Sequence, residues 1–120
     1  MLVAKTTKEP LKLMPLKRPT VYVLACSDGS LYTGATTDLA RRVAAHRRGR
    51  GAKYTRGRLP IALIAWWHPQ SFAAAKSQEM RFKRLSRPRK LAALCEDNLY
   101  GCRVHAPRDT IHRVSTPGLA

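Results

Sequence analysis

Two short apolar stretches near the start of the chain predict a β-hairpin. Residues 21–26 (VYVLAC) and 31–35 (LYTGA) are rich in residues that favour strands, and the SDGS between them is typical of a tight turn. Each stretch carries one tyrosine, Tyr22 and Tyr32. Either both rings belong to the core, as tyrosines in strands often do, or the hairpin holds two phenols at one site.

The register of this hairpin decides where the two tyrosines point. With a two-residue turn, Tyr22 and Tyr32 lie on opposite faces of the sheet, because a shift of one residue turns every side chain over. With a three-residue loop and Gly29 in the left-handed conformation, Tyr22 pairs with Gly34 and both phenols share one face. Gly29 suits either turn, so the sequence leaves both registers open.

The apolar pattern further along predicts one more strand and the first of three helices. Thr37 or Asp38 begins this helix and Gly49 ends it. Residues 61–67 (IALIAWW) are apolar at every position, which is typical of an interior strand covered by helices on both sides.

Two further helices complete the order of elements. Ser71 opens a helix over residues 71–86, and Pro88 in the first turn favours another over 87–94. The order β-β-α-β-α-α predicts an α+β fold with a small three-stranded antiparallel sheet flanked by helices.

The two ends of the chain lack this periodicity. Residues 1–19 contain three prolines and four lysines and are interpreted as a basic extended N-terminal arm. Residues 96–120 are expected to form an irregular C-terminal tail. A single domain is therefore expected over residues 20–95.

The first predicted helix directs two polar side chains toward the protein body. At 100° per residue, Arg42 and His46 fall within the stripe that Leu39 and Val43 mark. A charged group in this position needs an anionic partner, because an unpaired buried charge is costly. The structural alternative is that Arg42 lies at the edge of the stripe and His46 is a core histidine with its hydrogen bonds satisfied.

The second predicted helix directs an acidic side chain toward the protein body. Phe72, Ala75, Glu79 and Phe82 share one face, which puts Glu79 in the middle of an apolar stripe. The carboxylate either forms a pair with Lys83 four residues later or points inward to hold a hard cation such as Mg²⁺.

Charge narrows the choice of partner. There are 23 lysines and arginines against 7 acidic residues, a formal net charge of +16, and the pI is near 11.0. Such an excess predicts a polyanion partner, nucleic acid above all. A membrane surface is the weaker candidate, because no long stretch combines a basic face with a continuous apolar one. The three cysteines include no CxxC pair, which argues against disulfides and a zinc site and favours a soluble, cytoplasmic protein.

Together these positions resemble the GIY-YIG nuclease superfamily, and in particular its small single-domain bacterial members. The first family motif, Gly-Ile-Tyr, corresponds to TVY at 20–22, and the second, Tyr-Ile-Gly, to YTG at 32–34. The resemblance covers about residues 20–95 and includes DGSLYTG, TTDLARR, GRGAKYTRG and EMRFKRLSR.

The later family positions are also present. Arg42 matches the arginine of the helix after the second motif, His46 matches the His or Tyr one turn later, and Glu79 matches the metal-binding glutamate. Some members carry a lysine just after the second motif, where this chain has Ala35, and Lys53 is a candidate replacement.

The resemblance implies metal-dependent hydrolysis of a phosphodiester by water. Glu79 would be the single protein ligand to one Mg²⁺ or Mn²⁺ ion, and Arg42 would stabilise charge on the phosphate. Tyr22 or Tyr32 would act as the base while the other orients the water, and the sequence does not assign the two roles. His46 would hydrogen-bond that water or a tyrosine.

The loop RGRGAKYTRGR is a natural contact for a substrate strand. Its cations can follow phosphates, and its tyrosine offers a ring for base stacking, a mode suited to single strands. The structural alternative is a solvated loop. The candidate nucleic-acid-binding residues are Arg41, Arg50, Lys53, Tyr54, Arg56, Arg58 and Lys83.

These features predict an endonuclease that cuts DNA rather than RNA, single-stranded or structured, with little sequence specificity and a role in DNA repair or recombination. A monomer is expected, with a weak dimer as the alternative. The rival function is a basic nucleic-acid-binding protein with a silent nuclease site, which the composition fits equally well. What favours the nuclease is that a pure binder has no need of Glu79 inside an apolar stripe.

Overall fold

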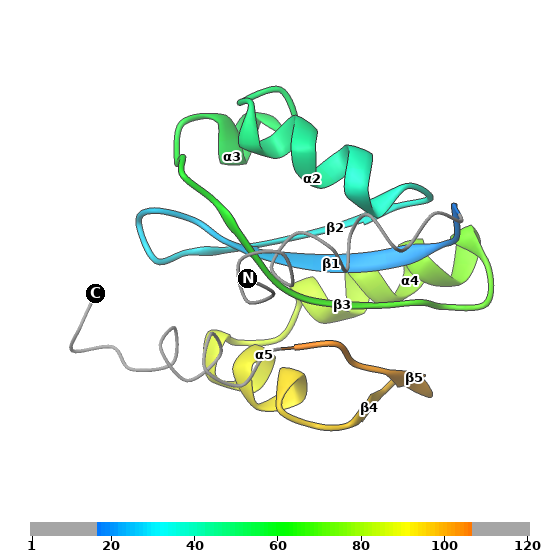
Figure 1. The fold of residues 1–120 in the computed structure, drawn as a ribbon. Helices are drawn as coiled ribbons and strands as arrows, with labels where there is room; N and C mark the ends of the chain where they lie inside the picture. Colours follow the sequence, from blue (N-terminus) through cyan, green and yellow to red (C-terminus); the bar gives the residue numbers. More distant parts are fainter. Residues whose placement is uncertain (1–16, 107–120) are drawn as a thin grey trace, which may run out of the picture.

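The predicted hairpin forms the centre and one side of a three-stranded antiparallel sheet (Figure 1). A computed structural model describes residues 17–106, so most of the expected N-terminal arm and the end of the expected tail lie outside the described residues. The strands are β1 (Thr20–Ala25), β2 (Leu31–Thr36) and β3 (Ala62–Trp67), in the order β2-β1-β3. The expected α+β architecture is confirmed.

The β1–β2 connection is the three-residue loop with a left-handed glycine. Gly29 has a φ of 85°, and the Cys26 amide donates to the Ser30 carbonyl at 2.9 Å, which closes the loop. Tyr22 therefore pairs with Gly34 and Leu24 with Tyr32, so the two tyrosines share a face of the sheet. Of the two registers that the sequence permits, the structure adopts this one.

The helices begin at the residues that the sequence indicated. In α2 (Leu39–Arg47), the Asp38 side chain caps the N-terminus by accepting from the Arg41 amide. Ser71 caps α4 (Phe72–Lys83) in the same way, by accepting from the Ala74 amide. The third predicted helix is α5 (Arg87–Leu94), with a proline in its first turn.

One short helix is missing from the prediction. α3 (Lys53–Arg56) lies within the basic loop, where four residues are too few to show a helical period. It packs through Thr55, which is fully buried, while its other side chains are exposed.

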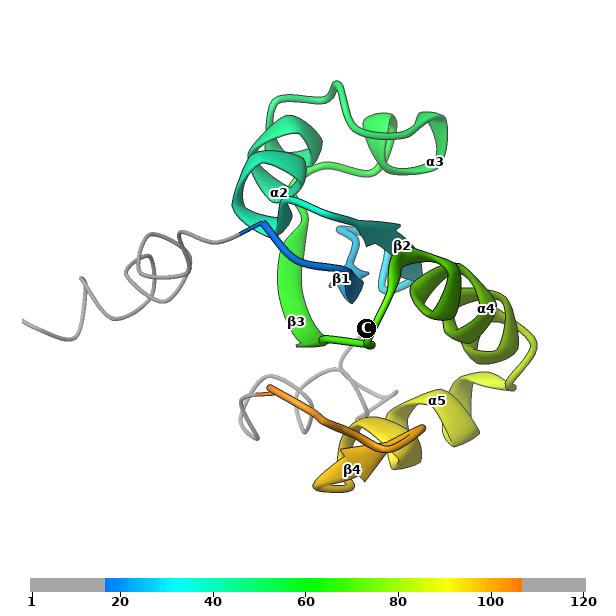
Figure 2. The same cartoon turned by 90° about the vertical axis from the view of Figure 1, so that its right-hand side faces the viewer.

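The sheet separates two clusters of apolar side chains. On one face, Tyr22 and Leu24 of β1 pack against Val43 and other apolar residues of α2. On the opposite face, Val21 and Val23 lie in a cluster with residues of α4 and α5. Figures 1 and 2 show α2 and α3 over the first face, α5 beyond the second, and α4 alongside β2.

The strand expected to be interior is at an edge of the sheet. Ile64 and Trp67 of β3 are completely buried, as its sequence predicted, but the central strand is β1. Part of the outer edge of β3 is closed by a bridge, because Trp66 and His105 exchange backbone hydrogen bonds of 3.0 and 2.9 Å. An apolar strand is compatible with this edge position because the following chain covers it.

Two expectations need correction. The tail is not wholly irregular, because β4 (Asn98–Leu99) and β5 (Cys102–Arg103) form a small hairpin that packs against the core. Strands of two residues are too short for alternation to reveal them. Phe72, placed in the buried stripe of α4 from its spacing, is 43% exposed because it lies in the first turn, at the end of the helix.

Every helix in residues 17–106 falls short of the length and apolarity needed to cross a membrane.

Candidate active site

Four of the five predicted catalytic side chains meet on the face of the sheet covered by α2. The ring centroids of Tyr22 and Tyr32 are 6.3 Å apart, and His46 lies 5.5 and 5.2 Å from them. The Tyr22 hydroxyl is 2.8 Å from His46 Nε2, and Arg42 Nε donates to the same hydroxyl at 3.3 Å. The hairpin register and the single turn between Arg42 and His46 together produce this cluster.

Two glycines make room for the rings. A Cβ added at Gly34 would lie 2.6 Å from Cζ of Tyr22, its partner across the hairpin. A Cβ at Gly51 would lie 2.7 Å from Cε1 of His46. Both distances are below the closest approach of real carbon atoms, so a larger residue at either position would displace a ring of the cluster.

The basic loop also fixes the imidazole. Thr55 Oγ1 donates to the Ala52 carbonyl at 3.1 Å and lies 2.8 Å from His46 Nδ1. Because the threonine proton is used on the carbonyl, His46 Nδ1 must be the donor to Thr55. In the neutral ring Nε2 is then the acceptor, and Tyr22 donates its phenolic proton to it.

Thr55 and Gly51 were not among the residues predicted from the sequence. Neither belongs to the periodic part of the chain, and the fully buried Thr55 stands among exposed basic residues. The sequence offers no sharper signal than that both are small uncharged residues in a loop with four arginines and one lysine.

Burial keeps both members of the Tyr22–His46 pair uncharged. It lowers the pKa of His46 to about 4, helped by the positive charge of Arg42. Burial also raises the pKa of Tyr22 to about 12, although the hydrogen bond from Arg42 acts in the opposite direction. At neutral pH the site therefore holds a phenol hydrogen-bonded to a neutral imidazole.

Glu79 approaches the cluster from α4. Its side chain is buried, and it forms ion pairs of 3.0 Å with Lys76 and 2.8 Å with Lys83. Lys83 Nζ also lies 5.9 Å from the ring centroid of Tyr32, which places the carboxylate on the tyrosine side of the helix. Burial opposes ionisation of Glu79, but the two lysines outweigh it and hold the pKa of the carboxyl below its usual range.

The sequence matches a known family. Residues 18–92 match the model of the GIY-YIG catalytic domain, which is more than half of the chain. The chain belongs to the GIY-YIG family. This is a nuclease family, so a nucleic acid is the substrate class that it implies.

Several similar proteins align with this chain over most of their own length. The UPF0213 protein of Streptococcus sanguinis is 51% identical over 76 residues, which are 63% of this chain and 87% of that protein. The UPF0213 protein VNG_2274C of Halobacterium salinarum is 55% identical over 75 residues, 60% of this chain and 94% of that protein. These names state no activity.

A solved relative is the UPF0213 protein BH0048 from Bacillus halodurans, whose structure was determined by NMR in solution. It is 43% identical in sequence and superposes with a TM-score of 0.46, covering 82% of this chain and 97% of that one.

The five predicted catalytic residues include one carboxylate for a divalent cation, that of Glu79. Among residues 17–106, no three His, Cys, Asp or Glu side chains come together as a metal-binding group. Glu79 Oε1 is buried and accepts no well-formed hydrogen bond within the described part of the chain, although the Lys76 ammonium is near. A buried carboxylate oxygen with unused capacity fits a hard cation whose other ligands are water and phosphate oxygens.

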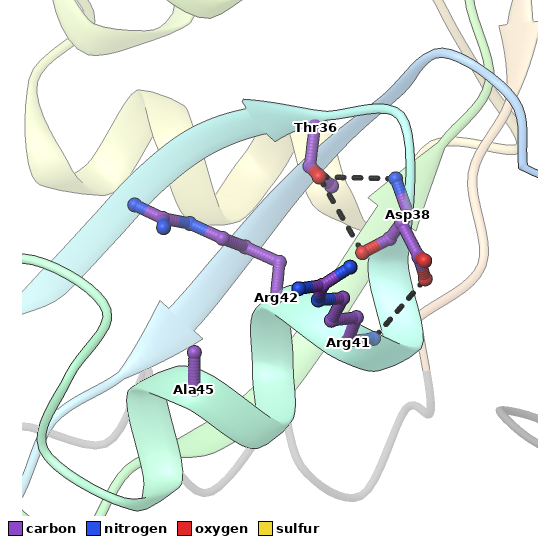
Figure 3. Close-up of a pocket in the computed structure, with 5 residues that line it drawn as sticks. All are labelled: Thr36, Asp38, Arg41, Arg42 and Ala45. Carbon is purple, nitrogen blue, oxygen red and sulfur yellow. Dashed lines mark hydrogen bonds between the residues drawn. The ribbon is translucent and has the colours of Figure 1, made fainter.

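A small cavity lies beside Arg42 (Figure 3). It measures about 150 Å³ and lies between the end of β2 and the start of α2. Figure 3 shows Arg41 close to Asp38, whereas the Arg42 side chain reaches out along the sheet, where it donates to Tyr22 and, at 2.9 Å, to the Gly51 carbonyl. Arg41 is exposed at this cavity, and only Arg42 belongs to the cluster around the tyrosines.

Some of the predicted nucleic-acid-binding residues already contact other side chains of the protein, and others are exposed. Arg58 pairs with Asp28 at 2.9 Å and lies 3.9 Å over the ring of Tyr54. Tyr54 in turn stacks on Tyr32, with centroids 5.9 Å apart. The remaining candidates are exposed side chains around this site, namely Arg41, Arg50, Lys53, Arg56 and Lys83.

Proposed function

We propose that this protein is a divalent-metal-dependent endonuclease that hydrolyses phosphodiester bonds in DNA with little sequence specificity. The observation that carries the proposal is the 2.8 Å hydrogen bond between the Tyr22 phenol and His46 Nε2, in a cluster that also holds Arg42. A cluster needed only for packing has no use for a buried phenol hydrogen-bonded to a buried imidazole beside a guanidinium group.

The direction of the hydrogen bonds supports Tyr22 as the base. A water oxygen attacks the phosphorus and gives its proton to the Tyr22 oxygen, while the phenolic proton passes to His46 Nε2. The P–O bond to the leaving oxygen breaks, and that oxygen takes a proton from solvent. Tyr32, which is only half-buried beside His46, orients the attacking water.

The low proton affinity of His46 in the free protein makes this transfer depend on substrate. Its pKa of about 4 follows from burial and from the charge of Arg42. A bound phosphate brings negative charge to Arg42, which weakens that repulsion and raises the pKa of His46. The imidazole therefore accepts a proton when substrate is in place.

Arg42 and Glu79 act on the phosphate. Arg42 uses two of its donors on Tyr22 and Gly51, and further N–H groups of its guanidinium can bind a phosphate oxygen whose charge increases in the transition state. Glu79 would hold the Mg²⁺ or Mn²⁺ ion, which supplies neutralisation of phosphate charge. With one carboxylate at the site, a single ion is proposed.

The exposed cations and Tyr54 support a single-stranded or structured substrate. They form a basic surface around the tyrosines. The Tyr54 ring can stack on an unpaired base once the Arg58 guanidinium that lies over it turns to a phosphate of the strand. We place the enzyme in the cytoplasm, acting as a monomer or a weak dimer in DNA repair or recombination.

The test is cleavage of labelled single-stranded and duplex DNA and RNA by the purified protein, with Mg²⁺, Mn²⁺ or EDTA. Single-stranded DNA should be cut with either metal, EDTA should abolish cutting, and Glu79→Ala should abolish it while DNA binding persists. Cleavage undiminished by EDTA would refute the metal role. Tight binding without cleavage under any condition would instead identify a nucleic-acid-binding protein with a silent site.

A further inference from the structure

Glu79 is held by two ammonium groups from its own helix. Lys76 Nζ lies 3.0 Å from Oε1 and Lys83 Nζ lies 2.8 Å from Oε2. The side chains of the lysines are about half exposed, 53% and 49%, whereas that of Glu79 is 7% exposed. In the free protein, therefore, flexible solvent-facing cations occupy the carboxylate that is proposed to bind metal.

The two lysines differ in what else they contact. A cavity of about 250 Å³ lies beside β2, and Lys83 lines it together with the Tyr32 and Tyr54 rings and Lys90 of α5. Lys76 is not part of its lining. Lys83 thus connects the carboxylate to a cavity that a second lysine and two tyrosines also line, and ammonium and phenol groups can donate hydrogen bonds to a phosphate.

A divalent cation and Lys83 compete for Glu79. A metal on the carboxylate repels the ammonium group and removes its partner, and a lysine side chain has enough rotatable bonds to turn away. The released charge is stabilised best by an anion within its reach, and the cavity is where such an anion would lie.

We propose that the cavity between β2, α3 and the α4–α5 pair binds a phosphate group of the substrate strand, and that Lys83 moves from Glu79 to this phosphate when a divalent cation takes the carboxylate. Lys90 is the second cation of the phosphate subsite. This inference rests on the proposed function, because it takes Glu79 as the metal ligand. Metal and strand then bind cooperatively. The metal frees Lys83 to bind the phosphate, and the phosphate draws Lys83 away from the carboxylate that the metal needs, so each ligand raises the affinity for the other by the same factor.

The test measures Mn²⁺ binding by the electron paramagnetic resonance signal of free Mn²⁺, with and without thymidine 3′,5′-bisphosphate. This probe has two phosphates and no phosphodiester bond, so a nuclease cannot cut it. The proteins compared are the natural chain, Lys83→Gln, Lys90→Gln, and Arg89→Gln. Arg89→Gln is the matched control because it removes one exposed charge from α5 outside the cavity lining.

Lys83→Gln should bind Mn²⁺ about two- to fivefold more tightly than the natural chain without the bisphosphate, the effect of removing one exposed ion pair. The gain in Mn²⁺ affinity on adding the bisphosphate should shrink in the same variant by a similar factor. Lys90→Gln should weaken bisphosphate binding and leave Mn²⁺ binding without it unchanged. Arg89→Gln should change neither quantity.

Equal Mn²⁺ affinity in Lys83→Gln and Arg89→Gln would overturn the competition between Lys83 and the metal for Glu79. If the bisphosphate raised the Mn²⁺ affinity of Lys83→Gln as much as that of the natural chain, the phosphate subsite would be overturned. Either result leaves Glu79 as a metal ligand and the proposed nuclease intact. Mn²⁺ binding that is the same in Glu79→Gln as in the natural chain would remove both the inference and the metal role proposed for Glu79.

Discussion

Thr55 ends a hydrogen-bond chain that begins at the phenol of Tyr22. The chain runs through His46, and both of its links to the imidazole measure 2.8 Å. Each of the three side chains is buried, so each polar atom depends on its neighbour rather than on water. Thr55, which takes no part in the proposed proton transfer, thus fixes which nitrogen of His46 carries the proton.

Thr55→Val removes the acceptor for His46 Nδ1 and keeps the shape of the side chain. We expect a loss of about 1–3 kcal/mol in the free energy of unfolding, because a buried N–H is left unpaired. Turnover should fall as well, because the imidazole can adopt the tautomer with its proton on Nε2, which cannot accept a hydrogen bond from Tyr22. Urea denaturation and cleavage rates measure the two effects.

Thr55→Ser is the matched control for that substitution. It keeps the hydroxyl and should restore turnover. A valine variant that retains both full stability and full turnover would show that Thr55 does not position His46.

His46 gives the stability a dependence on acid pH. Its pKa in the folded protein, about 4, lies below the ordinary 6.5, so the unfolded chain binds the proton more readily. The contribution of the neutral ring is fully present above pH 6.5 and is lost as the pH falls toward 4. Nuclear magnetic resonance of the His46 ring should find the midpoint near 4, and Arg42→Gln should raise it, whereas a midpoint near 6.5 would contradict burial of the neutral form.

At the scale of elements, the β1–β2 hairpin is what aligns the site. Its three-residue loop places Tyr22 and Tyr32 on one face, and Gly34 opposite Tyr22 leaves room for the phenol. The two glycines of the hairpin have different tasks. Gly29 is needed for its left-handed backbone, with open space around it, whereas Gly34 is needed because a side chain would collide with the ring.

Alanine substitutions separate these two tasks. Gly29→Ala should cost about 1–2 kcal/mol in unfolding free energy, the strain of a left-handed residue, and the folded protein should keep its turnover. Gly34→Ala should cost about 1–3 kcal/mol by overpacking and should also abolish turnover by displacing Tyr22. Unfolding in urea and cleavage at a temperature where both variants are folded distinguish them. Equal turnover in the two variants would be inconsistent with a catalytic Tyr22.

At the scale of the whole molecule, charge determines how a strand is attracted. The chain carries a net charge of +16, and many of its cations are exposed around the hairpin, α2 and α3. Phosphates release counterions when such cations bind them, so affinity should fall steeply with salt.

The exposed cations of α3 offer a direct test. Replacing both Lys53 and Arg56 by glutamine should reduce the slope of log K against log salt for single-stranded DNA by about 1.4. The double variant Arg81→Gln, Arg103→Gln removes the same charge near the β4–β5 hairpin, beyond the opposite face of the sheet, and should leave the slope unchanged. Fluorescence anisotropy across a salt series measures the slopes, and equal slopes for the two double variants would argue against α3 as part of the nucleic-acid interface.

The local features of the fold were readable from the chain alone. Caps such as Asp38 and Ser71 mark helix starts through their own hydrogen bonds to the next turn, and helical spacing was enough to turn Arg42, His46 and Glu79 inward. These are short-range effects between residues within one turn, which is why a pattern of polar and apolar positions predicts them.

Only the tertiary structure decided the hairpin register and the contacts between residues of different elements. The hairpin register was open in the sequence and was settled by packing of Tyr22 against α2, where its hydroxyl meets His46. The partnership of His46 with Thr55, the edge position of β3 closed by His105, and the place of Lys83 between Glu79 and a cavity all join residues from different elements. No periodicity encodes such contacts, because they depend on how the sheet and helices pack as a whole.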